Sequence, residues 1–485
     1  MPLRANTIGA MHILLIQPSQ YQGKLSLLYG KLGAIEQPPM GLAMLAAVLE
    51  KQGFEASILD IDAQKVSLAR ILELMDQKQT GLIGLSITTP LFPNAVRLSA
   101  AIKAVRPGVK ICLGGYHASM MPLSCLEPES IDYVVKGEGE RTIVELARAV
   151  EAGAGAERLR MVNGLYFKEK GKPVANPARE LIEDLDSLPF PARHLFEYQR
   201  YTYPDTKYSP AFPIFTSRGC PGKCSFCQQH YISGRRHRMR SARNIAEEVE
   251  LLISDFGARE IHIWDDMFSA NKKHIFEIRA EFQKRKIKIP LSFPAGIRVD
   301  TADPEVLAAL RGMGGYSVAF GVESGVQEIL DRCEKGIKLE QVWTAVANAK
   351  KAGLETWCFF MLGLPGETRE TVQKTIEFAM ELDPDVVKFH IFKPFPGSKL
   401  FQELKDAGLI LEFDFEKYAI HTFPVHRTEQ LSAEDIFRAQ QTAYRRFYFR
   451  PRMILKQFRR LNSLTRVRNN LGVGFRILRR ALNLG

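Results

Sequence analysis

Hydrophobic positions in the first 150 residues fall into two kinds of segment that alternate along the chain. Short runs rich in Leu and β-branched residues occupy 12–16, 56–60, 82–88, 110–115 and 133–136. Segments with helical spacing of apolar residues lie near 38–53, 67–77, 94–105 and 140–152. Strands that alternate with helices are typical of a parallel sheet covered by helices on both faces.

The first region therefore predicts a five-stranded, doubly wound, flavodoxin-like (Rossmann-type) α/β unit. Such sheets bind ligands at the carboxyl ends of their strands. A hairpin pattern over 163–174 follows this unit, and a linker containing Leu188-Pro189-Phe190-Pro191 comes after the hairpin.

A second alternating region begins at Pro213. Strand-like runs lie at 213–217, 260–264, 291–298, 316–323, 354–362 and 386–393. Helical segments lie between them, near 243–255, 271–286, 304–312, 340–352 and 369–381. This pattern predicts a partial (β/α)6 barrel, whose active site is expected at the carboxyl ends of its strands.

After about residue 410 the pattern becomes helical and increasingly basic. Apolar residues recur there every three or four positions from Ile454 to Leu482, which predicts an amphipathic helix that Gly472 and Gly474 interrupt. Four regions are thus expected along the chain. They are an N-terminal domain at 11–155, a hairpin and linker at 156–205, a barrel at 206–410 and a helical basic C-terminal region at 411–485.

Composition limits the class of protein. A chain of 485 residues is long enough for two or three domains, and 46% hydrophobic with 25% charged residues is ordinary for a globular protein. No apolar run reaches the ~20 residues that span a bilayer. Residues 1–10 lack a long apolar stretch, so a secretory signal is not expected there. Seven scattered cysteines do not form a disulfide framework, so a reducing cytoplasm is expected.

The net charge of +12 belongs to the C-terminal segment alone. Residues 445–485 hold twelve Lys and Arg and no acidic residue, and without them the basic residues equal the 54 acidic ones. This segment predicts contact with an anionic membrane surface. Two alternatives remain: simple packing of the apolar stripe on the barrel with Arg toward water, and, less favoured, binding of nucleic acid.

Three cysteines, Cys220, Cys224 and Cys227, form a CxxxCxxC motif directly after the first barrel strand. Iron–sulfur clusters and structural zinc both take four protein ligands as a rule, so three thiols leave one metal position open. Zinc is the alternative, with His230 or His237 as a fourth ligand. The CxxxC spacing does not match zinc ribbons, which favours a cluster.

This motif, with Phe226 before its last cysteine, resembles the signature of the radical S-adenosylmethionine (SAM) superfamily. The resemblance implies that the three cysteines bind a 4Fe-4S cluster whose open iron is chelated by SAM, with Phe226 beside it. Electron transfer then cleaves SAM to a 5′-deoxyadenosyl radical.

Segments at the ends of later strands also resemble this superfamily, and the resemblance implies SAM contacts for several residues. Asp265 and Asp266 would receive the ammonium group, although an Asp before a helix is also a common N-cap. Arg298 would bind the carboxylate, or form only a surface salt bridge. The other implied contacts are Glu323, Ser324 and Gly363, and the alternative for the glycine is a role in its turn alone.

The N-terminal unit resembles the cobalamin-binding domain found in many radical SAM enzymes. Its implied cobalamin contacts are Ser86, Thr88, Gly114 and Gly115. The DxHxxG motif that supplies a cobalt ligand in some cobalamin enzymes is missing, and His117 does not stand in that context. A domain that binds nothing remains the alternative. A GxGxxG fingerprint is also missing, which disfavours NAD.

The resemblance implies a cobalamin-dependent radical SAM enzyme that methylates an unactivated carbon. Oxidative cyclisation and ring rearrangement are the alternatives, with tRNA methylthiotransferase and a non-catalytic cobalamin sensor behind them. The expected partners are a small-molecule or lipid-like substrate, a reductant such as flavodoxin or ferredoxin, and a membrane surface at 450–485, whereas nucleic acid is disfavoured.

Overall fold

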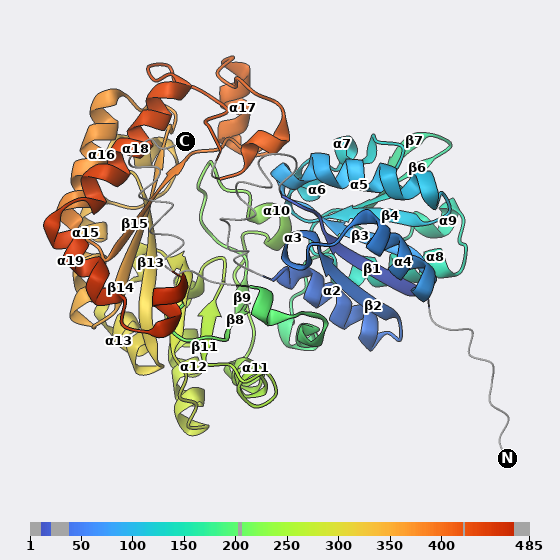
Figure 1. The fold of residues 1–485 in the computed structure, drawn as a ribbon, viewed down its shortest axis with the longest axis horizontal. Coiled ribbons are helices and arrows are strands. Elements are labelled where there is room, and N and C mark those ends of the chain that lie inside the picture. Colours follow the sequence, from blue (N-terminus) through green and yellow to red (C-terminus); the bar gives the residue numbers. More distant parts are fainter. Residues whose placement is uncertain (1–10, 21–37, 202–205, 421, 470–485) are drawn as a thin grey trace. The chain divides into compact units, whose positions relative to one another are not determined.

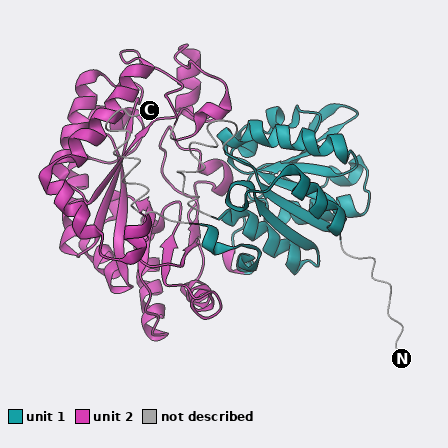
Figure 2. Ribbon diagram, viewed as in Figure 1, with its two compact units in different colours: residues 1–183, 187–201 teal, residues 184–186, 202–485 magenta. Residues whose placement is uncertain are grey.

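The structure is a computed structural model that describes residues 11–20, 38–201, 206–420 and 422–469. Two compact units make up the chain, as Figure 2 shows. Unit 1 comprises residues 1–183 and 187–201, and unit 2 comprises residues 184–186 and 202–485. The sequence-based domain boundaries stay predictions, and each unit is described below by itself.

The sheet of unit 1 has the order β2-β1-β3-β4-β5-β6-β7, with β1 to β5 parallel and the last two strands antiparallel. The order 2-1-3-4-5 is that of flavodoxin-like folds, which confirms the predicted architecture. Its strands are β1 (His12–Gln17), β2 (Glu55–Asp60), β3 (Thr80–Ser86), β4 (Lys110–Gly114), β5 (Tyr133–Val135), β6 (Leu165–Glu169) and β7 (Lys172–Ala175).

Helices cover both faces of this sheet. Side chains alternate across a strand, so Ile13 and Leu15 of β1 pack in one core with α2 and α8, whereas Leu14 and Ile16 pack in the other with α4 and α5. The helices of unit 1 are α2 (Met40–Lys51), α3 (Ile61–Gln64), α4 (Leu68–Lys78), α5 (Phe92–Val105), α6 (Tyr116–Met120), α7 (Pro122–Leu126), α8 (Glu140–Glu151) and α9 (Ala156–Leu159).

The predicted hairpin is present as β6 and β7. Because β6 pairs antiparallel with β5, the hairpin extends the sheet of unit 1. The polypeptide that follows, up to Tyr201, also belongs to this unit.

Unit 2 contains a sheet of six parallel strands in the order β15-β14-β13-β12-β11-β8. Neighbours in space follow one another along the chain, which confirms a partial (β/α)6 barrel (Figure 1). Its strands are β8 (Ala211–Ile214), β11 (Glu260–Ile263), β12 (Leu291–Ile297), β13 (Gly315–Glu323), β14 (Glu355–Leu362) and β15 (Val386–Ile391). A separate short ribbon pairs β9 (Ser217–Arg218) with β10 (Arg238–Met239).

Polar caps define the starts of the main helices of unit 2. Side chains of Ser241, Asn271 and Asp303 accept backbone N–H bonds at the first turns of α11, α12 and α13. The helices of unit 2 are α10 (His230–Ser233), α11 (Ala242–Ser254), α12 (Lys272–Lys284), α13 (Pro304–Gly312), α14 (Gln327–Arg332), α15 (Leu339–Lys351), α16 (Arg369–Leu382), α17 (Lys399–Asp406), α18 (Ala433–Tyr448) and α19 (Pro451–Arg460).

The last two helices differ in what they bury. Helix α18 buries Ile436, Ala443 and Phe447, and the Tyr444 hydroxyl accepts the Phe389 N–H at 3.2 Å. Helix α19 buries Met453 alone. Within the described residues, no helix combines the length and apolar character needed to cross a bilayer. The predicted interruption at Gly472 and Gly474 lies outside the described residues.

Candidate functional site

The three predicted cluster cysteines lie on one loop that follows β8 and β9. A Cβ placed on Gly222 would stand 3.3 Å from Cys220 Sγ and 3.9 Å from Cys224 Sγ, so these two sulfurs are no more than about 7 Å apart. The Gly222 N–H donates to Cys220 Sγ and the Gln229 N–H donates to Cys227 Sγ, each at 3.4 Å. Backbone N–H groups directed at sulfur favour the thiolate form that binds metal.

The donor set fits an iron–sulfur cluster better than a single zinc ion. Within the described ranges, no three His, Cys, Asp or Glu side chains converge on one metal-ion position, and His230 and His237 do not complete one. A cluster takes one thiolate at each of several irons. Burial raises the pKa of Cys227 to about 11 and also raises that of Cys224, so metal must displace protons when it binds.

Asp265 fixes the strand end that leads into the cysteine loop. Its carboxylate is buried and accepts the Thr216 N–H at 2.6 Å, the Ser217 hydroxyl at 2.6 Å and the Thr216 hydroxyl. Burial raises the pKa of Asp265 to about 6, against the effect of these bonds. The contacts favour a positioning role for this residue, and the predicted SAM contact stays untested.

Asp266 holds both ends of the cysteine loop. It accepts the Gly219 N–H at 2.7 Å, directly before Cys220, and a bond from the Gln229 side chain, two residues after Cys227. The alternative of a helix N-cap is wrong for both aspartates, because Asn271 caps the following helix α12. Its carboxylate therefore ties β11 to the loop, as a ligand-positioning group does.

Arg298 follows β12 and points its guanidinium toward the cysteine loop. It donates to the carbonyls of Lys335 and Gly336 at 3.1 Å each and forms an ion pair with Asp300 at 2.8 Å. Its Nη1 is 3.7 Å from the Cβ position of Gly222. Arg298 therefore makes more contacts than the single surface salt bridge that was considered as its alternative.

Lys335 is a site residue that the sequence did not indicate. It is buried, forms an ion pair with Glu323 at 2.8 Å and places its Nζ 5.9 Å from the centroid of the Phe226 ring. Its positive charge, like that of Arg298, acts on Cys224 and opposes the pKa rise that burial causes there. Two cations therefore lie near the thiols. Lys335 stands in the turn after α14, where no motif marks it.

The remaining predicted SAM contacts serve turns in this structure. Ser324 is fully buried and lies 3.2 Å from the Thr375 hydroxyl. Gly363 has φ of +87°, donates its N–H to Glu367 at 2.6 Å and accepts from His426 Nε2 at 2.7 Å. Burial raises the pKa of Glu367 to about 8. The sequence did not indicate Glu367 or His426 as site residues, and the SAM contacts of Ser324 and Gly363 stay predictions.

The predicted cobalamin contacts lie at the carboxyl ends of β3 and β4 in unit 1. Gly115 has φ of +98°, and a Cβ there would be 2.8 Å from the Ile87 carbonyl oxygen and 3.3 Å from Ser86 Oγ. A Cβ on Gly114 would meet no atom within 4 Å, so its backbone is open to a bulky ligand. Thr88 is exposed beside them. The four cobalamin contacts stay predictions.

His117 lies inside unit 1. It is fully buried, its Nδ1 is 3.2 Å from Thr89 Oγ1, and its ring lies 4.8 Å from that of Phe92. Burial lowers its pKa to about 4. These contacts agree with a structural role and not with a cobalt ligand.

Comparison with known proteins agrees with both units. Residues 214–379 match the Radical SAM superfamily and residues 33–147 match the B12 binding domain. An uncharacterised methyltransferase of Pyrococcus horikoshii is 33% identical over 447 residues, which covers 92% of this chain and 94% of the relative. The anaerobic magnesium-protoporphyrin IX monomethyl ester cyclase of Rubrivivax gelatinosus is 30% identical, over 90% of this chain and 77% of the cyclase.

Among solved structures, the cobalamin-dependent SAM radical enzyme OxsB, with aqua-cobalamin and SAM bound, has a TM-score of 0.75 at 16% identity and covers 98% of this chain and 72% of its own. The radical SAM methyltransferase TsrM from Kitasatospora setae, with cobalamin and a [4Fe-4S] cluster bound, has a TM-score of 0.67 at 21% identity, over 82% of this chain and 75% of its own. At these identities the likeness shows the shared fold.

Proposed function

Because the chain belongs to the radical SAM superfamily, in the group with a B12 binding domain, we propose that it methylates an unactivated carbon of a small-molecule substrate. Its cofactors are a 4Fe-4S cluster, SAM and cobalamin. One observation carries the proposal. Three thiols lie on one short loop at the carboxyl end of β8, and the cations Arg298 and Lys335 stand beside it.

When bound, the cofactors supply hydrogen abstraction from carbon and a transferable methyl group. The protein supplies their positions. Cys220, Cys224 and Cys227 would hold the cluster, while Asp265 and Asp266 fix the loop that carries them. Rigid placement matters because a displaced ligand loses both affinity and rate.

The two cations suit an anionic group of SAM. Arg298 offers a planar guanidinium, which binds carboxylates in a bidentate manner. Glu323 balances Lys335 and Asp300 balances Arg298, each at 2.8 Å, so these residues offer cations for a carboxylate and acidic groups for an ammonium. In unit 1, Ser86 and Thr88 would bond a nucleotide tail, while Gly114 and Gly115 leave room for the ligand.

Oxidative cyclisation is the second candidate, since the cyclase of Rubrivivax gelatinosus shares 30% identity over most of both chains. A methylthiotransferase is less supported, although a putative one of Methanocaldococcus jannaschii is 29% identical over 307 residues. That reading requires a second set of three cysteines in the N-terminal region. Cys112 and Cys125 are instead single buried thiols on β4 and α7.

The proposal extends to partners and location. Reduction of the cluster requires an electron donor such as flavodoxin or ferredoxin, and all seven cysteines are free thiols, which suits a reducing cytoplasm.

Anaerobic reconstitution followed by incubation with methyl-labelled SAM, reductant and cobalamin tests the function. We expect about four irons per chain, formation of 5′-deoxyadenosine, and label transferred to cobalamin. Label on cobalamin supports methyl transfer, whereas 5′-deoxyadenosine without such label favours the cyclase-like reaction. No 5′-deoxyadenosine after full reconstitution contradicts the radical chemistry, and about eight irons favours the methylthiotransferase reading.

A further inference from the structure

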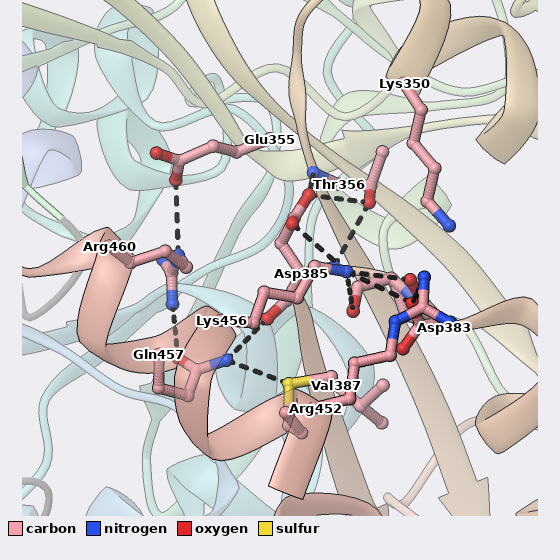
Figure 3. A network of polar contacts seen from close by, with 12 residues as sticks. Lys350, Glu355, Thr356, Asp383, Asp385, Val387, Arg452, Lys456, Gln457 and Arg460 are labelled. Carbon is pink, nitrogen blue, oxygen red and sulfur yellow. Dashed lines mark hydrogen bonds and ion pairs between the residues drawn. The ribbon is translucent and has the colours of Figure 1, made fainter.

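Helix α19 buries one apolar side chain, Met453, and its other contacts with the barrel are made by polar side chains. Lys456 Nζ donates to the carbonyls of Asp383 and Pro384 at 3.0 and 3.2 Å, and the Gln457 amide donates to the Asp385 carbonyl at 2.8 Å. Figure 3 shows these side chains directed at the turn before β15. The face of the helix that carries Lys456 and Gln457 is therefore fastened to the amino end of the barrel strands.

A second anchor lies at and beyond the end of the helix. Arg460 pairs with Glu355, the first residue of β14, at 3.4 Å (Figure 3). Arg466 is buried and donates to both oxygens of Glu355 at 2.6 and 2.8 Å, with its guanidinium 5.5 Å from the Tyr316 ring. A buried, bidentate pair of this kind holds the segment in one orientation.

The opposite face of the segment is apolar and exposed. On this face of α19, Ile454, Leu455 and Phe458 are 42%, 52% and 67% exposed. Leu461 and Leu464, which follow the end of the helix at Arg460, are exposed as well. The exposed arginines Arg452 and Arg459 border this face in the helical spacing, and Arg452 also pairs with Asp383 at 3.2 Å. Packing of the stripe on the barrel, one alternative from the sequence, is therefore wrong for α19.

We propose that this apolar face docks on the surface of an anionic lipid bilayer. Apolar side chains bordered by arginines insert at the boundary of headgroups and acyl chains, while the arginines meet anionic headgroups. Residues 445–485 contain no acidic side chain. A second copy of the face, or residues 470–485 of the same chain, would therefore bring positive charge against positive charge, whereas anionic lipid complements it.

Co-sedimentation of the reconstituted full chain with vesicles tests the proposal. The vesicles are phosphatidylcholine alone, or phosphatidylcholine with about one quarter phosphatidylglycerol. We expect binding to the anionic vesicles that weakens at high salt. The double variant Leu455→Ser with Phe458→Ser should lose about tenfold or more in affinity, because two large apolar groups no longer enter the lipid. Both side chains are exposed, so the fold should be kept.

The matched control is Leu123→Ser with Met161→Ser, two exposed apolar residues of unit 1, which should bind like wild type. Equal sedimentation of the Leu455/Phe458 variant, or equal binding to neutral vesicles, overturns the proposal. A dimer that only this variant disrupts, measured by light scattering, assigns the face to a second copy and also overturns it. Binding that disappears when 470–485 is deleted assigns the lipid contact to that segment and overturns the proposal. Binding that appears only after the deletion also overturns it, because that segment is then what covers the face.

Discussion

The two ends of the barrel strands use the same acidic residue type for different purposes. At the carboxyl end, Asp265 and Asp266 accept bonds from backbone N–H groups and short side chains of the cysteine loop. At the amino end, Asp383, Asp385 and Glu355 pair with Lys and Arg side chains of the C-terminal segment. Asp385 also accepts the Thr356 N–H, so a backbone bond alone does not distinguish the roles. The element at the other end of the bonds does: bonds to the cysteine loop position a site, whereas ion pairs with the C-terminal segment fasten a helix.

The largest effect should come from the cysteine loop itself. Cys224→Ala removes one of three cluster ligands, so iron content and 5′-deoxyadenosine formation should fall below detection. The free energy of unfolding of the apo protein should stay within about 0.5 kcal/mol of wild type, since the thiol is only partly buried. Cys125→Ala, at a buried thiol of unit 1, should keep full iron content. Wild-type activity of Cys224→Ala would show that this loop does not hold the cluster.

Asp266→Asn tests whether the carboxyl-end carboxylates position ligands. The amide keeps the size of the side chain but loses the charge that accepts from Gly219 and Gln229. Iron affinity and activity should fall about 10- to 100-fold, the range typical of groups that orient metal ligands. The iron content per chain and the rate at which a chelator removes the cluster measure the loss of affinity. Unchanged cluster lifetime, with only SAM affinity lowered, would assign Asp266 to SAM contact instead.

Asp385→Ala is the corresponding change at the amino end. Asp385 accepts from Thr356 N and Oγ1 at 2.7 and 3.0 Å and lies 3.3 Å from Lys456 Nζ. We expect a loss of about 1–3 kcal/mol in the free energy of unfolding, because buried donors lose their acceptor, with normal iron content and 5′-deoxyadenosine yield. Denaturant unfolding beside an iron assay checks both. If the folded variant loses its cluster, the amino end also affects the site, and the comparison between the two ends fails.

Much of this arrangement could be predicted from the sequence because it is local. Hydrophobic runs and their spacing indicated both sheets, and the cysteine motif occupies eight consecutive residues. Lys335 could not be found in this way, since its contact with Glu323 and Phe226 depends on the turn after α14. Helical spacing also identified which residues of α19 share a face, but not which face is bound. That choice depends on Glu355, Asp383 and Asp385, which lie at least 70 residues earlier.

Glu367→Gln tests a carboxylate at the carboxyl end that has no ion pair among the described residues. Glu367 accepts the N–H groups of Gly363 and Leu364 at 2.6 and 3.1 Å. Burial raises its pKa from 4.5 to about 8.

Since the folded pKa is the higher one, the stabilising contribution of Glu367 is complete below pH 4.5 and is lost as pH rises toward 8. Wild type should therefore lose up to about 2.5 kcal/mol relative to Glu367→Gln between pH 5 and pH 7, as one proton contributes at most about 1.4 kcal/mol per pH unit. Denaturant unfolding of both proteins at pH 5, 6 and 7 measures this difference. Parallel pH profiles of the two proteins would show that this carboxyl group titrates normally. Backbone bonds alone would then, as at Asp385, not distinguish the acids at the carboxyl end of the strands from those that fasten α19.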